Sequence, residues 1–189
     1  MITLHTDRLT IRESSGRDFS RIYAMMLSEC GAREDGAVSI FGAVSDNEDE
    51  ELEKYLAYIH TVYSVFGFGL CTVELRRTGE IIGWCGLQPI GDDNSPLGRI
   101  ELGYLIAREY RMQGYALEAC RAILRFAFDR LELEEVYVRI DETNLPSLNL
   151  AKKLGFSKKS GDLLLCVRQH FSGSGYSVPN VSTVMDAIL

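Results

Sequence analysis

The feature that most constrains this 189-residue chain is a strand, a basic turn and a long helix that follow one another between Arg99 and Ala127. The apolar run from Ile100 to Ile106 predicts a strand, and the spacing of apolar residues after Gly114 predicts an amphipathic helix. The turn between them reads Arg111-Met112-Gln113-Gly114-Tyr115-Ala116. Such a junction directs backbone N–H groups and the positive end of the helix dipole at one place. An anion is expected there, and a pyrophosphate is the best candidate.

This turn resembles the Arg/Gln-x-x-Gly-x-Gly/Ala turn with which the GNAT superfamily of acyl-CoA N-acyltransferases holds coenzyme A. The resemblance continues on both sides, in the order and spacing of the RimJ/RimL-like branch, through Thr6-Asp7-Arg8-Leu9-Thr10-Ile11-Arg12, Glu101-Leu102-Gly103-Tyr104, Asn144-Leu145-Pro146-Ser147 and Lys153-Leu154-Gly155-Phe156. It implies an α/β protein (α+β by some schemes) with the GNAT fold. That fold has a mixed central sheet of about six to seven strands, splayed between the fourth and fifth and flanked by about four helices.

Composition limits the functional classes that the chain can join. A length of 189 residues with 46% hydrophobic content suits one domain over residues 1–189. The formal net charge of −7 argues against a nucleic-acid partner, because neutralising phosphates needs a surplus of Lys and Arg. No apolar run approaches the length of a membrane span and no apolar signal core opens the chain, so we expect a cytoplasmic protein without a membrane partner.

The cysteines and histidines do not predict a metal site. The five cysteines are widely spaced, without a Cys-x-x-Cys pair, and are expected to be reduced core residues. His5, His60 and His170 lie far apart in the sequence and do not have the spacing of metal ligands.

Apolar periodicity and turn residues predict the remaining elements. Strands are expected over residues 7–13, 68–76, 80–88, 100–106, 136–140, 163–168 and 181–189, the last two as a closing pair. Helices are expected to begin after Ser15, at Glu48 and near Pro146, besides the long helix after Gly114. The buried face of the second helix is expected to carry Leu52, Tyr55, Leu56, Ile59 and Tyr63. Residues 31–47 and 91–98 are expected to be loops.

The resemblance implies three segments that bind coenzyme A. The turn Arg111 to Ala116 would hold the pyrophosphate, where a side chain at Gly114 would push the backbone away; an ordinary glycine-containing helix start is the alternative. The splayed strand would offer unpaired backbone groups of Tyr104, Leu105 and Ile106 to the pantetheine amides, with an N–H near Ile106 polarising the thioester. Gly103 fits either a bulge there or close packing.

The third segment is the short helix after Pro146. Asn144 is expected to bind the pantetheine side, as the family asparagine does, and Ser147 to lie near the thiol. Lys153 is expected at the adenosine 3′-phosphate, with a simple solvated helix charge as the alternative. Asn149 stands where relatives often carry an arginine for the cofactor phosphate, so no residue is assigned to that contact.

Two residues are candidates for proton transfer. Glu101 begins the splayed strand and could take a proton, directly or through water, from an amine whose pKa is about 10; a salt-bridged surface carboxylate is the alternative. Many GNAT enzymes have a tyrosine as general acid seven residues after the helix asparagine, but this chain has Ala151 there. Ser147 is the best remaining hydroxyl, with a serine that only bonds the helix backbone as the alternative. A thiolate of pKa about 8.5 leaves with little help, so a dedicated acid is not required.

The sequence therefore predicts an acetyl-CoA-dependent N-acetyltransferase that needs no metal and acts by direct attack in a ternary complex. The acceptor is a primary amine, either a protein N-terminus or a small molecule, and the resemblance does not choose between them. An acyl-CoA-binding sensor without a working base is one alternative. A nucleotide-phosphate-binding protein is another, disfavoured because neither a Walker nor a Rossmann pattern is present. The oligomeric state is left open, with a homodimer as one option.

Overall fold

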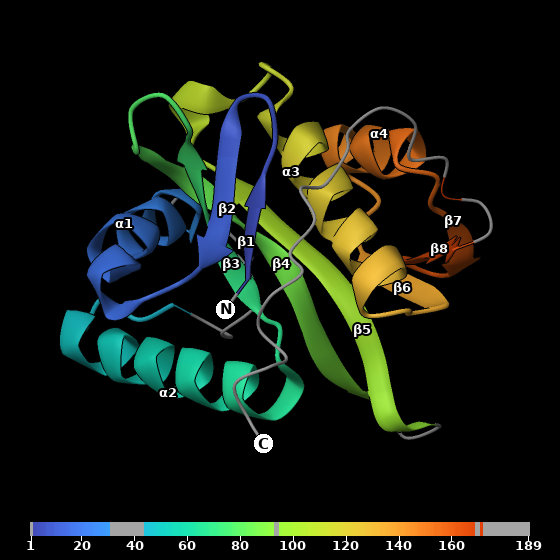
Figure 1. Cartoon of the computed structure of the whole chain (residues 1–189), viewed down its shortest axis with the longest axis horizontal. Helices are drawn as coiled ribbons and strands as arrows, with labels where there is room; N and C mark the ends of the chain where they lie inside the picture. The colour runs from blue at the N-terminus through green and yellow to red at the C-terminus, as the bar shows by residue number, and fades with distance from the viewer. Residues whose placement is uncertain (1, 31–43, 93–94, 169–170, 172–189) are drawn as a thin grey trace, which may run out of the picture.

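The computed structural model describes residues 2–30, 44–92, 95–168 and 171, and it contains one mixed sheet with helices packed on both faces (Figure 1). The strands are β1 Thr3–His5, β2 Leu9–Glu13, β3 Leu70–Leu75, β4 Ile81–Asp92, β5 Ser95–Ile106, β6 Glu135–Arg139, β7 Ser157–Ser160 and β8 Leu163–Val167. The helices are η1 Gly16–Asp18, α1 Phe19–Cys30, α2 Glu48–Phe66, η2 Arg108–Tyr110, α3 Tyr115–Arg125, η3 Phe126–Arg130 and α4 Leu145–Lys153.

The strand order is β1-β2-β3-β4-β5-β6-β8-β7, and every neighbouring pair is antiparallel except β5 and β6. The parallel pair is in register only at Glu101 and Tyr137. The predicted splay between the fourth and fifth expected strands therefore lies between β5 and β6, and the α/β class and mixed sheet are confirmed.

The predicted strand number of six to seven is wrong, because the described sheet has eight strands. The sequence reading missed β1 and β7, which lie at the two edges of the sheet. Strand β7 reads Ser-Lys-Lys-Ser and is exposed throughout, so it lacks the apolar alternation that reveals a strand. It also takes the place beside β8 that we assigned to residues 181–189, which lie outside the described residues.

The loop predicted over residues 91–98 is also wrong, because β4 and β5 form one long hairpin with Asp92 paired to Ser95. The residues that indicate a turn lie within this hairpin. They accompany a register irregularity between Ile90 and Asp92 and include Gly98, whose φ is 69°. A Cβ at Gly98 would meet the Ile90 carbonyl oxygen at 2.4 Å. Glycine is therefore required inside the strand, where composition alone indicates a loop.

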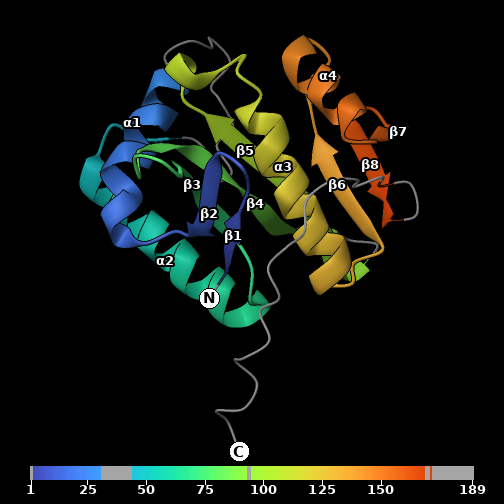
Figure 2. The same ribbon diagram turned by 45° about the horizontal axis from the view of Figure 1, so that its top comes forward.

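Two groups of buried side chains hold the helices to the sheet. Residues Cys120, Leu124 and Phe128 pack the predicted stripe of α3 and η3 onto β2, β4 and β5. Phe19, Ile22 and Tyr55 pack α1 and α2 onto the other side. Figures 1 and 2 show α1 and α2 beside the first strands, and α3 and α4 together near β5 and β6.

The second helix confirms its predicted start and most of its buried face. The Asn47 side chain caps it by accepting a hydrogen bond from the Glu50 N–H at 3.3 Å. Tyr55 is buried, but Leu56 is 42% exposed, so its predicted place on the buried face is wrong. The helix packs through a narrower stripe than the sequence pattern indicates.

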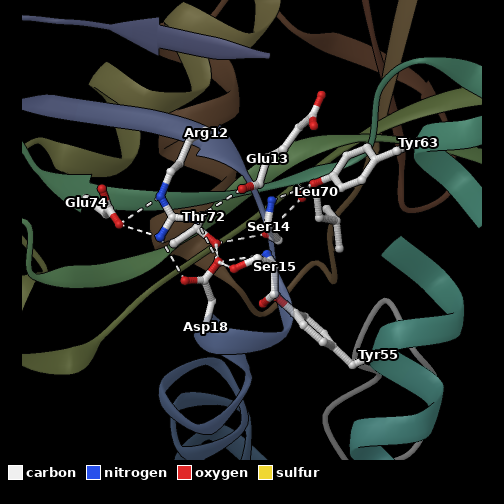
Figure 3. A network of polar contacts seen from close by, with 10 residues as sticks. All are labelled: Arg12, Glu13, Ser14, Ser15, Asp18, Tyr55, Tyr63, Leu70, Thr72 and Glu74. Atoms are coloured by element: carbon white, nitrogen blue, oxygen red, sulfur yellow. Dashed lines mark hydrogen bonds and ion pairs between the residues drawn. The ribbon is translucent and has the colours of Figure 1, made fainter. Parts of the chain in front are cut away.

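A polar network joins β2, β3, η1 and α2 (Figure 3). The Arg12 guanidinium donates two hydrogen bonds to the Asp18 carboxylate, each of 2.8 Å, and a third of 2.9 Å to Glu74. The other Asp18 donors are the Ser15 N–H at 2.8 Å, the Ser15 hydroxyl at 3.2 Å and the Thr72 hydroxyl at 3.1 Å. The network therefore fixes the chain where it leaves β2 for the first helices.

The carboxylate of Asp18 has a lowered pKa. Burial on its own would raise this pKa, but the hydrogen bonds from Arg12, Ser15 and Thr72, with the Arg12 charge, lower it below the ordinary 3.8. A lowered pKa in the folded state means that Asp18 adds stability above its ordinary pKa. That stability is lost as the pH falls through the folded-state value.

We expect Asp18→Asn to lower the free energy of unfolding by about 2 kcal/mol at pH 7, because an amide would turn N–H donors toward the Arg12 guanidinium. The variant should also lose less stability than the wild type on acidification. Urea denaturation between pH 7 and pH 3 measures both effects. Asp129→Asn, at an exposed position, is the control and should stay within about 0.5 kcal/mol of the wild type. An Asp18 variant with wild-type stability would contradict the structural role of the network.

Candidate functional site

The predicted anion turn lies between η2 and α3 and is exposed from Arg111 to Gly114. Two of its residues have left-handed backbone, Met112 with φ 59° and Gly114 with φ 82°. A non-glycine residue rarely adopts this conformation, and Met112 also leaves its side chain 97% exposed. Met112 thus adopts an unfavourable backbone conformation, and its exposed side chain makes little packing contact that could offset the cost.

The backbone N–H groups of the turn are open. Within the described part of the chain, the N–H groups from Met112 to Ala116 have no acceptor, and no side chain caps α3 at Gly114. The Arg111 N–H departs from the prediction, because it donates to the Arg108 carbonyl at 3.2 Å. Five of the six predicted amides therefore remain available to an anion at the helix N-terminus.

Two side chains of the turn, those of Arg111 and Gln113, bond back to the protein backbone. The Arg111 Nε donates to the Ile106 carbonyl at 2.8 Å, and the Gln113 side-chain amide donates to the Glu109 carbonyl at 3.1 Å. Tyr115 is half-buried, with the guanidinium of Arg8 4.3 Å from the centre of its ring. The Ile106 carbonyl is thus engaged, where we expected it to be open.

The splayed edge of β5 lies next to the turn. Beyond Glu101 no pair with β6 is recorded, so in the described residues Tyr104, Leu105 and Ile106 continue without a strand partner on that side, and Arg111 bonds the Ile106 carbonyl. Gly103 pairs with Gly86 in a stretch of the β4–β5 ladder that has no register shift, so the predicted bulge is absent from this ladder. The edge can offer backbone groups to an extended ligand.

The structure brings Tyr104, Asn144 and Ser147 together across the splay. The Tyr104 hydroxyl donates to the Ser147 Oγ at 2.8 Å, and the Ser147 N–H donates to the Asn144 Oδ1 at 3.2 Å. Burial raises the pKa of Tyr104 to about 12, with the Ser147 contact acting in the opposite direction. Tyr104 therefore stays protonated near neutral pH, and the sequence reading missed its bond to Ser147 because it pairs residues 43 positions apart.

The other catalytic candidate, Glu101, lies on β5 away from this cluster. Its side chain is largely buried, with 8% of the residue exposed, and its Oε1 has no hydrogen-bond donor among the described residues. The nearest cation is Arg139, whose Nη2 is 3.7 Å from that oxygen. The structure therefore gives Glu101 a long ion pair through a buried oxygen that receives no hydrogen bond from the described residues.

Strand alternation puts the two candidates on opposite faces of the sheet. Glu101 and Tyr104 are three residues apart, so their side chains leave β5 in opposite directions. Tyr104 packs with the α3 side of the core, whereas Leu105 packs with the α1 and α2 side. Glu101 and Ser147 thus reach the splay from different faces.

Lys153 and a pocket complete the surroundings. Lys153 is exposed in the last turn of α4, as either predicted role requires. A pocket of about 250 Å³ lies between β1 and α3, and Gly114 is the predicted site residue that lines it. The pocket thus lies on the side of α3 that faces β1.

The described residues do not contain three or more His, Cys, Asp or Glu side chains arranged as metal ligands. Cys71, Cys85, Cys120 and Cys166 are buried free thiols. In the same part of the chain no helix is long and apolar enough to cross a membrane.

Comparisons with known proteins agree with this geometry. Residues 8–157 match the family model described as the acetyltransferase (GNAT) domain. A Bacillus licheniformis protein named "uncharacterized N-acetyltransferase p20" is 27% identical over 160 residues, which cover 84% of each chain. The spermidine N(1)-acetyltransferase of Escherichia coli is 30% identical over 79 residues, 42% of each chain. The crystal structure of an acetyltransferase from Agrobacterium tumefaciens matches with a TM-score of 0.67 and 25% identity, covering 87% of this chain and 92% of that one.

Because the Asn144 side chain caps α4, Asn144→Ala should lower the free energy of unfolding by about 1 kcal/mol. Asn144→Asp keeps the acceptor oxygen and should retain most of this stability. Urea denaturation compares the two, with the exposed Asn149→Ala in the same helix as the control, expected within about 0.5 kcal/mol of the wild type. Equal losses in the Ala and Asp variants of Asn144 would show that the cap is not what Asn144 provides.

Proposed function

Because the chain belongs to the acetyltransferase (GNAT) domain family, we propose that it transfers an acetyl group from acetyl-CoA to a primary amine. The observation that carries this proposal is the set of open N–H groups from Met112 to Ala116 at the uncapped start of α3. Open N–H groups at a helix N-terminus suit a diphosphate, and the turn is exposed from Arg111 to Gly114. The motifs around Glu101, Asn144 and Lys153 support a place in the RimJ/RimL-like branch.

The residues around the splay fit the remaining parts of coenzyme A. The edge of β5 from Tyr104 to Ile106, apart from the Ile106 carbonyl that Arg111 bonds, would receive the pantetheine amides in the manner of an added strand. The cap leaves the amide nitrogen of Asn144 as a further donor, since only its oxygen is used by α4. Lys153 would approach the 3′-phosphate. When bound, acetyl-CoA supplies the thioester whose acyl group the amine receives.

Glu101 would act as the base for the incoming amine. An amine with a pKa of about 10 is mostly protonated at neutral pH and must lose a proton before it can attack. Glu101 has an oxygen without a hydrogen-bond donor, and its side chain points to the face opposite Ser147. The amine and the thiol would then be served from opposite sides of the sheet, which suits direct attack in a ternary complex.

Ser147, backed by Tyr104, would serve the leaving thiol. Because the Tyr104 hydroxyl donates to Ser147, the Ser147 oxygen already has one donor and can direct its own proton elsewhere. Tyr104 keeps its own proton at neutral pH, because burial raises its pKa to about 12. This pair would take the place of the tyrosine that is Ala151 here, a buried residue of α4.

The acceptor is a primary amine, either a protein N-terminus or a small molecule. The partial similarity to a spermidine N(1)-acetyltransferase makes polyamines one class to include in an acceptor screen. The second candidate is a catalytically weak acyl-CoA-binding sensor, favoured by the missing tyrosine at Ala151. Release of free thiol over an amine panel distinguishes the two, because a sensor binds acetyl-CoA without releasing thiol.

Gly114→Glu should raise the dissociation constant for acetyl-CoA by at least about a hundredfold, because a side chain at this left-handed position would disturb the turn and its carboxylate would repel the diphosphate. Gly161→Glu is the matched control, since Gly161 also has a positive φ, 50°, but lies in the turn between β7 and β8. Both variants should lose about 1 kcal/mol of stability from the left-handed backbone. Calorimetry that finds wild-type affinity in Gly114→Glu would refute the diphosphate assignment.

Glu101→Gln should lower kcat/KM by about a hundredfold at pH 7, because the amine then lacks a base. The loss should shrink as the pH rises toward the pKa of the amine, where the acceptor is already neutral. A pH profile of thiol release measures this, with the exposed Glu53→Gln on α2 as the control. A constant deficit at every pH would remove Glu101 as the base.

A further inference from the structure

The segment that joins β1 to β2 lies against the first turn of α3. The Glu118 carboxylate receives four donors from it: the Thr6 hydroxyl at 2.6 Å, the Arg8 N–H at 2.9 Å, and the Arg8 Nε and Nη2 at 2.7 and 2.6 Å. All four come from two residues, so the carboxylate is held in one orientation. The start of the chain is thereby tied to the helix whose N-terminus forms the anion turn.

Arg8 continues from Glu118 to the turn itself. Its Nη1 donates to the Gln113 carbonyl at 2.9 Å, and its guanidinium lies over the Tyr115 ring, 4.3 Å from the centre. One side chain therefore contacts the residues on both sides of Gly114. A Cβ built on Gly114 would itself lie 3.4 Å from the Arg8 Nη2.

The bond to the Gln113 carbonyl fixes the direction of an N–H group. The Gln113 carbonyl and the Gly114 N–H belong to one planar peptide, in which they point in opposite directions. Holding the carbonyl toward Arg8 therefore turns the Gly114 N–H to the far side of the turn. Gly114, with φ 82° and no Cβ, could otherwise rotate this peptide at little cost.

We propose that Arg8 is a positioning residue that presets the Gln113–Gly114 peptide for the diphosphate of acetyl-CoA, an inference that rests on the proposed function. Its charge is balanced by the Glu118 carboxylate, and its three nitrogen atoms already have acceptors in the protein. Arg8 thus acts through the backbone of the turn and not by touching the ligand. Presetting lowers the cost of ordering the turn when the ligand binds.

The test compares Arg8→Met with the wild type on two acetyl donors, acetyl-CoA and S-acetylpantetheine, which lacks the diphosphate. We expect the KM for acetyl-CoA to rise about tenfold with kcat nearly unchanged, because the turn must be ordered during binding. The kinetic constants for S-acetylpantetheine should stay at the wild-type values. A merely structural role would lower both activities together.

Arg76→Met is the matched control. The Arg76 Nη1 donates to the Thr6 carbonyl at 3.2 Å, so this exposed arginine holds the same segment without touching the turn. It should leave the KM for acetyl-CoA unchanged. Arg8→Lys keeps the charge but lacks the planar guanidinium that bonds Glu118 and the Gln113 carbonyl at the same time. This variant should still raise the KM for acetyl-CoA several-fold. It also keeps the inference testable if Arg8→Met does not fold.

The outcomes separate this inference from the proposed function. Wild-type protein that does not bind acetyl-CoA in calorimetry contradicts the proposed function and removes the basis of the inference. Wild-type binding with an unchanged KM in both Arg8 variants overturns the inference alone. Equal losses with acetyl-CoA and S-acetylpantetheine would also overturn it, because Arg8 would then support the whole fold and not the turn.

Discussion

The parting of β5 from β6 is the constraint on which the rest of the structure depends. Parallel neighbours normally share a continuous ladder, but here the register is recorded at Glu101 and Tyr137 alone. Each backbone group released from a ladder must find another partner or water. In the described chain only some of these backbone groups have a recorded partner. The Ile106 carbonyl is one of them, because it accepts a hydrogen bond from Arg111. In the proposed function, the backbone groups that remain unpaired would bind an extended ligand between two halves of one sheet.

The helices differ in how the N–H groups of their first turns are satisfied. Asn144 caps α4 and Asn47 caps α2 with a side-chain oxygen, whereas α3 begins at Gly114 without a side-chain cap. A cap at that position would add about 1 kcal/mol of stability but would occupy the N–H groups that an anion needs. The missing cap is therefore consistent with a site whose acceptor comes from a ligand. The Glu118 carboxylate bonds Arg8 and does not accept a hydrogen bond from the first N–H groups of α3.

The sequence predicts most of the fold because its strongest patterns are local. The stripe through Cys120, Leu124 and Phe128, the glycine turn and the Pro146 helix start each lie in a short window, and all are confirmed. The edge strand β7 is missed because its side chains are all exposed. The long hairpin is missed because Gly98 allows β4 and β5 to approach closely and does not mark a loop. Local sequence patterns indicate burial and turns, but they do not show which strands pair or how closely those strands approach.

The site follows the same division. The anion turn is readable because its demands, an absent Cβ and open N–H groups, come from adjacent residues. The bond between Tyr104 and Ser147 and the contacts of Arg8 are not readable, since each joins residues that only the folded sheet and helices bring together. The sequence alone therefore indicates the turn that would bind an anion. The long-range contacts that fix the conformation of this site appear only in the structure.

Strand alternation has a consequence for any reaction at this gap. An amine must lose a proton and a thiolate must gain one, and two separate side chains can serve these transfers if solvent afterwards returns each to its starting protonation state. Residues an odd number apart on β5 face opposite sides, so Glu101 and the Tyr104–Ser147 pair are kept apart by the sheet itself. The separation needs no loop and no moving part. In the proposed reaction, the period of one β-strand therefore assigns base and acid to different substrates.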